Sequence, residues 1–141
     1  PPDAATVAAG AASVAGVDSV VRRAVARVAP LVSRPVAEIA ERMPREPDEQ
    51  YALGNLLADA QRWAGRGDVA VMNNGGIRAE LRAGTATYGT LFEIQPFANV
   101  LSKVTVRGRD LRAYAERFVA REVPRVHVSG LLLTFDPARP E

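Results

Sequence analysis

The chain has 141 residues, of which 48% are hydrophobic and 24% charged, a composition typical of one globular domain with its own core. A net charge of +2 is too small to indicate nucleic-acid binding, and the lack of cysteine excludes disulfides and cysteine-bound metals. No stretch reaches the roughly 20 strongly apolar residues that a membrane span requires.

The N-terminal part is expected to be a linker followed by a helix. Residues 1–16 are small and apolar but lack the basic and leucine-rich regions of a signal peptide, so we expect a linker or a disordered segment. Apolar residues then recur at helical spacing, which predicts an amphipathic helix over 17–32 that caps the domain or links it to another. The apolar positions are Val17, Val20, Val21, Ala24, Val28 and Leu31.

Strand and helix patterns alternate through the rest of the chain. The predicted strands are 36–40, 69–72, 100–106 and 130–135. The predicted helices are 53–64 and 110–121, with short helical turns at 79–82 and 90–94. The inward faces would carry Leu53, Leu56, Leu57, Ala60 and Trp63 on the first helix, and Leu111, Tyr114, Ala115 and Phe118 on the second.

This alternation, without internal repeats, predicts one α/β (α+β layered) domain over 17–141. We expect a mixed sheet that contains both 69–72 and 100–106, with the helices 53–64 and 110–121 packed on it.

A turn and a cation follow the strand at 69–72. Residues 73–76 read Asn-Asn-Gly-Gly, and the two glycines allow a backbone geometry in which the main chain can approach a ligand closely. Arg78 follows, and its planar guanidinium suits a phosphate or a carboxylate. The alternative for Arg78 is a surface ion pair with Glu80 or Glu93.

A second loop sets an aromatic residue beside a rigid proline. Residues 95–99 read Gln-Pro-Phe-Ala-Asn, so an amide stands two residues after Phe97. Phe97 could stack on a flat ring or could equally be a core residue. With the glycine turn and Arg78, this loop would suit an anionic ligand that carries a flat ring.

These elements resemble the C-terminal domain of the 5'-nucleotidase family. Residues 73–78 resemble its N-G-G-G-I-R element, and residues 95–99 resemble its (L/Q)-P-F-G-N loop. Residues 53–60 are similar to its L-G-N-L helix start, and residues 104–111 to its following strand, turn and helix. The four elements occur in the family's order and cover about residues 36–135.

The resemblance implies a substrate site. The arginine at 78 would contact the substrate near its phosphate and ribose, and Phe97 would be the first of two rings that sandwich the base. Asn73 would point at the substrate, or bond its own turn, and Asn99 would reach the base edge. The expected substrate-binding residues are Arg78, Asn73, Gly75, Gly76, Phe97 and Asn99.

Some other residues are expected to have structural roles, and two positions differ from the family's pattern. Asn74 replaces the family's first glycine, and Pro47 replaces a further substrate arginine for which Arg45 is a candidate substitute. Asp59 is expected to bond a neighbouring loop, and His127 to be an ordinary surface residue. Gly54 would hold the start of its helix and Gln95 would brace its loop.

Hydrolysis in this family takes place in a separate N-terminal metallophosphatase domain that holds two metal ions. The ligand motifs of such a centre (D-x-H, G-D-x-x-D, G-N-H-E and G-H-x-H) are absent from these 141 residues, which contain one histidine. We therefore expect no catalytic residue, metal or other cofactor in this chain, and a divalent metal pair in the N-terminal domain.

The expected function is nucleotide recognition for a metallophosphoesterase of the periplasm or the cell exterior, with a nucleotide and the N-terminal domain as partners. The G-G-D-G-(F/Y) segment that brings the second ring does not occur either, which we interpret as a truncated domain or a degenerate member. Two alternatives remain: a non-catalytic stand-alone binding or interaction module, and an unrelated α/β domain in which the glycines only shape a turn.

Overall fold

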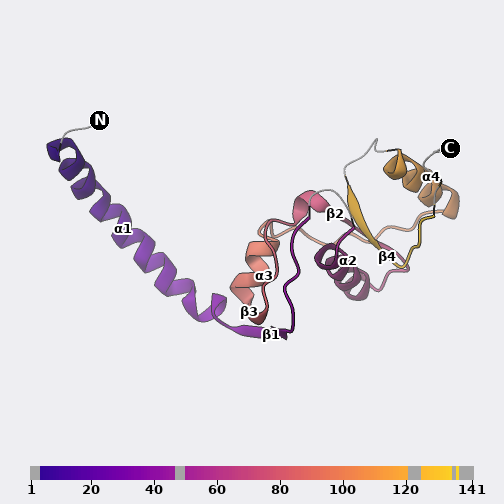
Figure 1. The fold of residues 1–141 in the computed structure, drawn as a ribbon, viewed down its shortest axis with the longest axis horizontal. Coiled ribbons are helices and arrows are strands. Elements are labelled where there is room, and N and C mark those ends of the chain that lie inside the picture. The colour runs from indigo at the N-terminus through magenta and orange to yellow at the C-terminus, as the bar shows by residue number, and fades with distance from the viewer. Residues whose placement is uncertain (1–3, 47–49, 121–124, 135, 137–141) are drawn as a thin grey trace.

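Helices and short strands alternate along the chain in the computed structural model, which describes residues 4–46, 50–120, 125–134 and 136 (Figure 1). The helices are α1 (Ala4–Val32), α2 (Ala52–Gly65), α3 (Tyr88–Ile94) and α4 (Gly108–Val119). The strands are β1 (Pro35–Ile39), β2 (Ala70–Asn73), β3 (Gly84–Thr87) and β4 (Val126–Ser129), with a 3-10 turn, η1 (Asn74–Gly76), directly after β2. The expected α/β class is confirmed.

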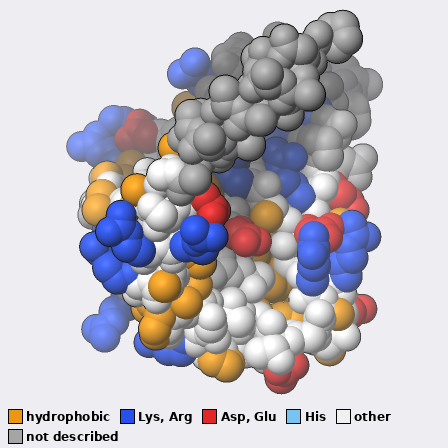
Figure 2. All heavy atoms as spheres, turned by 90° about the vertical axis from the view of Figure 1, so that its left-hand side faces the viewer, with side chains coloured by type: hydrophobic (Ala, Val, Ile, Leu, Met, Phe, Trp, Pro, Cys, Tyr) orange, Lys and Arg blue, Asp and Glu red, His pale blue; other side chains and the backbone are white. Residues whose placement is uncertain are grey.

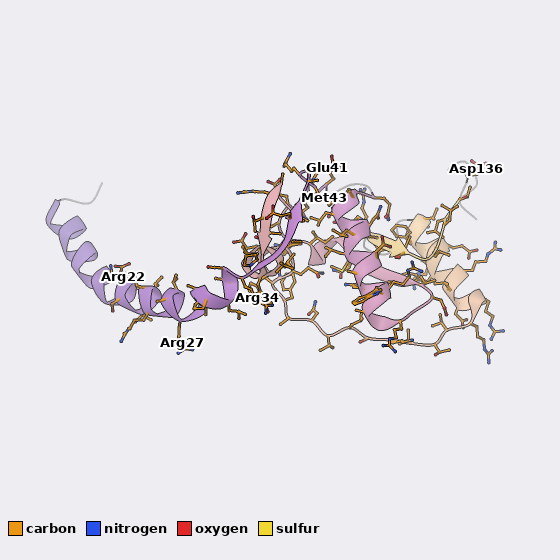
Figure 3. All side chains as sticks on the ribbon, turned by 90° about the horizontal axis from the view of Figure 1, so that it is seen from below. Arg22, Arg27, Arg34, Glu41, Met43 and Asp136 are labelled. Atoms are coloured by element: carbon orange, nitrogen blue, oxygen red, sulfur yellow. The ribbon has the colours of Figure 1, made fainter. Side chains whose placement is uncertain are left out.

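Helix α1 extends away from the other elements, with Arg22 and Arg27 along it and Arg34 where the chain leaves it (Figure 3). It begins at Ala4 rather than at residue 17, so it includes most of the expected linker. Its C-terminal end packs on α3, where a Cβ atom at Gly89 would lie 3.0 Å from the carbonyl oxygen of Val32.

The apolar side chains of α1 from residue 17 onward are largely exposed. On the face that Figure 2 shows, Lys and Arg side chains form separate groups among hydrophobic and acidic ones rather than one basic patch. None of the helices in the described part of the chain has the length and apolarity that a membrane crossing needs.

The strands form two separate antiparallel pairs. Strand β1 pairs with β3, with an irregularity between Pro35 and Ala37, and β2 pairs with β4, so that Met72 lies opposite His127. Helix α2 packs on the second pair (Figure 1). The prediction of one sheet that contains both 69–72 and 100–106 is therefore wrong.

Residues 100–106 lie exposed and form no strand. They run past the end of α2, where the Nζ of Lys103 donates to the carbonyl of Arg66 at 2.6 Å. The alternating apolar residues of this segment are typical of a strand, but a strand also needs a partner, and the described residues offer none at this place.

Two further local predictions are wrong. Residues 79–82 are not helical: Leu81 forms an isolated β-bridge with Met43, with two backbone hydrogen bonds of 2.8 and 3.0 Å. The last strand lies at Val126–Ser129, and 130–134 are not in a strand; Phe135, the end of the predicted strand, lies outside the described residues.

The core lies between α2, β2 and the segment that leads to α3. It contains Tyr51, Leu53, Ala58, Met72, Ile77, Leu81, Ala86 and Ile94. The predicted inward face of α2 is confirmed at Leu53, which is buried, but wrong at Leu56, Ala60 and Trp63, which are exposed. The helix turns Gly54 and Ala58 inward with Leu53. Helix α4 buries no residue, so its predicted packing on a sheet is also wrong.

His127 is buried rather than a surface residue, with only 1% of its side chain exposed. Its ring lies against the backbone of Gly54, where an added Cβ atom would come within less than 3.0 Å of three ring atoms. The ring also meets that of Tyr51 edge to face, with centroids 4.5 Å apart. Neither ring nitrogen has a hydrogen-bond partner among the described residues, and burial lowers the pKa of His127 below its usual 6.5.

This burial predicts that the free energy of unfolding falls as the pH is lowered below about 6.5. In that range the unfolded chain binds a proton at His127 more readily than the folded chain does, so acid favours unfolding, by at most about 1.4 kcal/mol per pH unit. Urea unfolding of the wild type and of His127→Phe between pH 5 and 8 tests this. The variant should lose most of the slope, since His127 is the only histidine; equal slopes would contradict the prediction.

Candidate functional site

A groove of about 560 Å³ lies between α2 and the segment 95–102. Its polar lining residues are Gln61, Asn73, Gln95, Asn99 and Ser102. Its apolar lining includes Leu57, Met72, Phe97 and Leu101. The described residues that line it carry amide and hydroxyl groups but no charge, so the groove suits an uncharged, partly aromatic group that forms hydrogen bonds along its edge.

The glycine turn forms one side of this groove. Gly76 is needed for space rather than for a left-handed backbone, because an added Cβ would lie 2.6 Å from the Cε of Met72 and 3.3 Å from the Oδ1 of Asn73. Neither Gly75 nor Gly76 has a positive φ. The expectation of a special backbone conformation in this turn is thus wrong, and the glycines instead let the Asn73 side chain lie over the turn.

Asn74, which replaces the family's first glycine, does not line the groove. Its side chain is 8% exposed, and its Oδ1 accepts a 2.5 Å hydrogen bond from the hydroxyl of Tyr51. Its backbone nitrogen donates to the carbonyl of Arg125 at 2.9 Å. The substitution therefore places a side chain on the core side of the turn and leaves the groove side open.

Arg78 lies beside the groove without lining it. Its backbone nitrogen donates to the carbonyl of Ile94 at 2.8 Å, and the carbon of its guanidinium lies 5.9 Å from the centroid of the Phe97 ring. The alternative ion pair with Glu80 does not form, because Glu80 accepts from Arg42 at 2.5 Å and this contact holds the pKa of Glu80 below its usual value.

Phe97 is 53% exposed, which excludes the alternative that it is a core residue. Asn99, two residues on, is exposed and lines the same groove. Between them Ala98 has a φ of 48°, in the left-handed region that favours glycine. The family's loop has a glycine at this point, so the alanine holds the loop under backbone strain.

We expect Ala98→Gly to raise the free energy of unfolding by about 0.5–1 kcal/mol, since release from the left-handed strain exceeds the entropy that glycine adds to the unfolded chain. Urea unfolding measures the change. Ala83→Gly is the matched control: Ala83 is an exposed loop alanine without a positive φ, so its replacement should lower stability. Equal changes in the two variants would contradict this interpretation.

Two glutamine side chains support the groove. Gln61 and Gln95 both donate from Nε2 to the sulfur of Met72, at 3.0 and 3.5 Å, so Gln95 braces its loop as expected. The sequence does not indicate a role for the half-buried Gln61, since a single glutamine on a helix carries no signal. Away from the groove, Asp59 was expected to bond a neighbouring loop, but its partner lies in a strand, because Asp59 accepts from the hydroxyl of Ser129, the last residue of β4.

Arg45, the candidate substitute for the family's further arginine, lies next to the Arg78 backbone. Its Nε donates to the carbonyl of Ile77 at 2.7 Å. Of the six predicted site residues, the structure places Asn73, Gly76, Phe97 and Asn99 on the groove and Gly75 and Arg78 beside it. Their role in binding stays a prediction.

These features define a small α/β domain with an open groove, lined by apolar, amide and hydroxyl side chains, at the ends of β2 and α3. The chain belongs to the family of the 5'-nucleotidase C-terminal domain, whose model matches residues 27–141.

Two relatives that match this chain are much longer proteins. The chain is 41% identical over 110 residues to the endonuclease YhcR of Bacillus subtilis. This match covers 76% of this chain and 9% of that protein. It is 37% identical over 100 residues to the cell wall protein Lmo0130 of Listeria monocytogenes, covering 62% of this chain and 13% of that protein. Its sequence thus spans about a tenth of these relatives.

The fold has a close counterpart among solved structures. The crystal structure of a 5'-nucleotidase precursor from Thermus thermophilus matches 87% of this chain and 26% of its own, with a TM-score of 0.69 and 29% identity.

Proposed function

We propose that this chain is the nucleotide-recognition domain of a metal-dependent phosphoesterase that hydrolyses nucleotides. The observation that carries the proposal is the arrangement of an exposed aromatic ring, two amide side chains and a guanidinium around one groove. Phe97, Asn73 and Asn99 line it, and Arg78 lies 5.9 Å from the Phe97 ring.

Each group would recognise one part of a nucleotide. The base would stack on Phe97, a contact worth about 1–3 kcal/mol in single-strand binders. The amides of Asn73 and Asn99 would form hydrogen bonds with the base edge or the ribose, and Arg78 would bind the phosphate beside the groove. Gly75 and Gly76 would keep the turn thin enough for the ligand to approach Asn73.

The chemical step would belong to an N-terminal metallophosphatase domain. Its divalent metal pair would activate the attacking water. The described residues hold no group of three or more His, Cys, Asp or Glu side chains that could bind a metal ion, so we derive no metal-dependent step for this chain. Its contribution would be to place the phosphate correctly. A location in the periplasm or outside the cell is part of the proposal, and the cell wall relative supports it.

Titration of the 141-residue chain with AMP, followed by two-dimensional NMR of the backbone amides, tests the proposal. We expect saturable shifts at residues 73–78 and 95–99, with weak affinity because one ring and one arginine must offset the loss of ligand freedom. Separate titrations with adenosine and with inorganic phosphate distinguish the base contact of Phe97 from the phosphate contact of Arg78. The absence of shifts, or shifts only elsewhere, would contradict the proposal.

Phosphatase assays on the full-length product of the gene, with AMP, UDP-glucose and 2',3'-cyclic AMP, identify the substrate class. Binding of AMP by the domain without hydrolysis of any of these by the full-length protein would favour the stand-alone binding module instead.

A further inference from the structure

The turn that carries Asn73 and leads to Arg78 is held on its core side by a buried side-chain hydrogen bond, in addition to the backbone bond from Asn74 to Arg125. The hydroxyl of Tyr51 donates to the Oδ1 of Asn74 at 2.5 Å, and both side chains are almost completely buried, 6% and 8% exposed. Asn74 is the first residue of η1, so this bond attaches the turn directly to the residue that precedes α2.

The Tyr51 hydroxyl is itself fixed in place. Its ring meets the ring of His127 edge to face at 4.5 Å, and His127 fills the space that Gly54 leaves open. The preceding residue, Gln50, donates from its side chain to the carbonyl of Val126 at 2.5 Å. Because the ring cannot move without displacing a buried neighbour, the hydroxyl can serve as a rigid anchor.

A movement of Asn74 would displace the side chains of both Asn73 and Arg78. Asn73 is its neighbour in the chain, and the Asn73 side chain lies over Gly75 and Gly76. The Nη1 of Arg78 donates to the carbonyl of Gly75 at 3.5 Å, so the guanidinium rests on the same turn.

We infer that Tyr51 is a positioning residue, which acts through Asn74 to hold the Asn73 and Arg78 side chains in the geometry that binds a nucleotide. The inference rests on the proposed function for its ligand, but the position of the turn can be measured without any ligand. It gives a buried polar pair, Tyr51 and Asn74, a role that a pair of apolar residues could not fill.

The test compares Tyr51→Phe, Asn74→Ala and the double variant with the wild type. Tyr51→Phe removes the hydroxyl and keeps the ring that packs on His127. We expect AMP to bind roughly 3- to 10-fold more weakly to each single variant. The double variant should lose no more than Asn74→Ala alone, because that change already removes the acceptor of the Tyr51 hydroxyl. In ligand-free NMR spectra the signals of the Arg78 Nε–H and of the Asn73 side-chain amide should shift in all three variants.

Ser129→Ala is the matched control. It also removes a buried hydroxyl, one that donates to Asp59 at the opposite end of β4. We expect it to lower the melting temperature as Tyr51→Phe does, while AMP affinity and both NMR signals stay unchanged.

Two outcomes would overturn the inference. One is a Tyr51→Phe variant that loses stability but keeps AMP affinity and both signals, which is the behaviour of a merely structural residue. The other is an equal response of the signals in Ser129→Ala. If the wild type binds no AMP, the proposed function fails, and the ligand-free signals alone then decide whether Tyr51 positions the turn.

Discussion

Gly54→Ala is expected to destabilise the folded domain by about 3 kcal/mol, the upper part of the range for overpacked cores. The added methyl group would lie less than 3.0 Å from three ring atoms of His127, and that ring is only 1% exposed. It has no free space to enter, because Tyr51 lies against it on another side. The clash must therefore push α2 away from β4, at the point where the two elements pack. Urea unfolding at pH 7.5, where His127 is neutral, measures the loss.

A double variant identifies the source of the loss. Gly54→Ala combined with His127→Ala removes the ring that the methyl group strikes, so the double variant should be more stable than the sum of the two single losses implies. Gly108→Ala is the control, since a Cβ atom at Gly108 meets no atom within 4 Å and alanine favours the helix it begins. Additive losses in the double variant would show that Gly54 does not serve to accommodate His127.

Arg78→Ala should weaken AMP binding by about tenfold or more and leave adenosine binding nearly unchanged. A charge-assisted bond to phosphate contributes about 1.5–3 kcal/mol, and each 1.4 kcal/mol is a factor of ten in affinity. Adenosine has no phosphate, so it keeps only the contacts to the ring and the amides. In the full-length protein the same change should lower kcat/KM for AMP while metal binding stays intact.

Arg82→Ala is the matched control for Arg78→Ala. Arg82 is also an exposed arginine, but its Nε bonds Glu80 at 3.3 Å, and it lies outside the groove. Both variants should keep the stability of the wild type within about 0.5 kcal/mol, since both side chains are on the surface. Equal losses of AMP affinity in the two variants would indicate a general charge effect rather than a phosphate contact by Arg78.

The sequence patterns predicted the features that depend on interactions between residues close together in the chain. Helix α2, strands β1 and β2 and helix α4 occur where periodicity and glycine stops indicate them, because a helix or strand forms from the preferences of adjacent residues. The family resemblance was also visible in the sequence and is confirmed, since its motifs are short contiguous segments.

The tertiary structure decided which strands pair and which faces are covered. Residues 100–106 have the alternation of a strand, yet β2 pairs with 126–129, a segment whose Val-His-Val-Ser sequence gives no strong signal. Pairing of distant strands depends on which edges the whole fold brings together. For the same reason Trp63 and the inner face of α4 stay uncovered, although their spacing is that of a buried stripe.

Three further features depend on the assembled fold. They are the side of the turn that Asn74 faces, the burial of His127 and the left-handed backbone of Ala98. Each is set by contacts between residues far apart in the chain, or by the path that the loop must follow to reach them. The sequence by itself determined the family, the α/β class and the residues of the candidate site. Only the tertiary structure, through such long-range contacts, placed four of those residues on one groove and Tyr51 behind it.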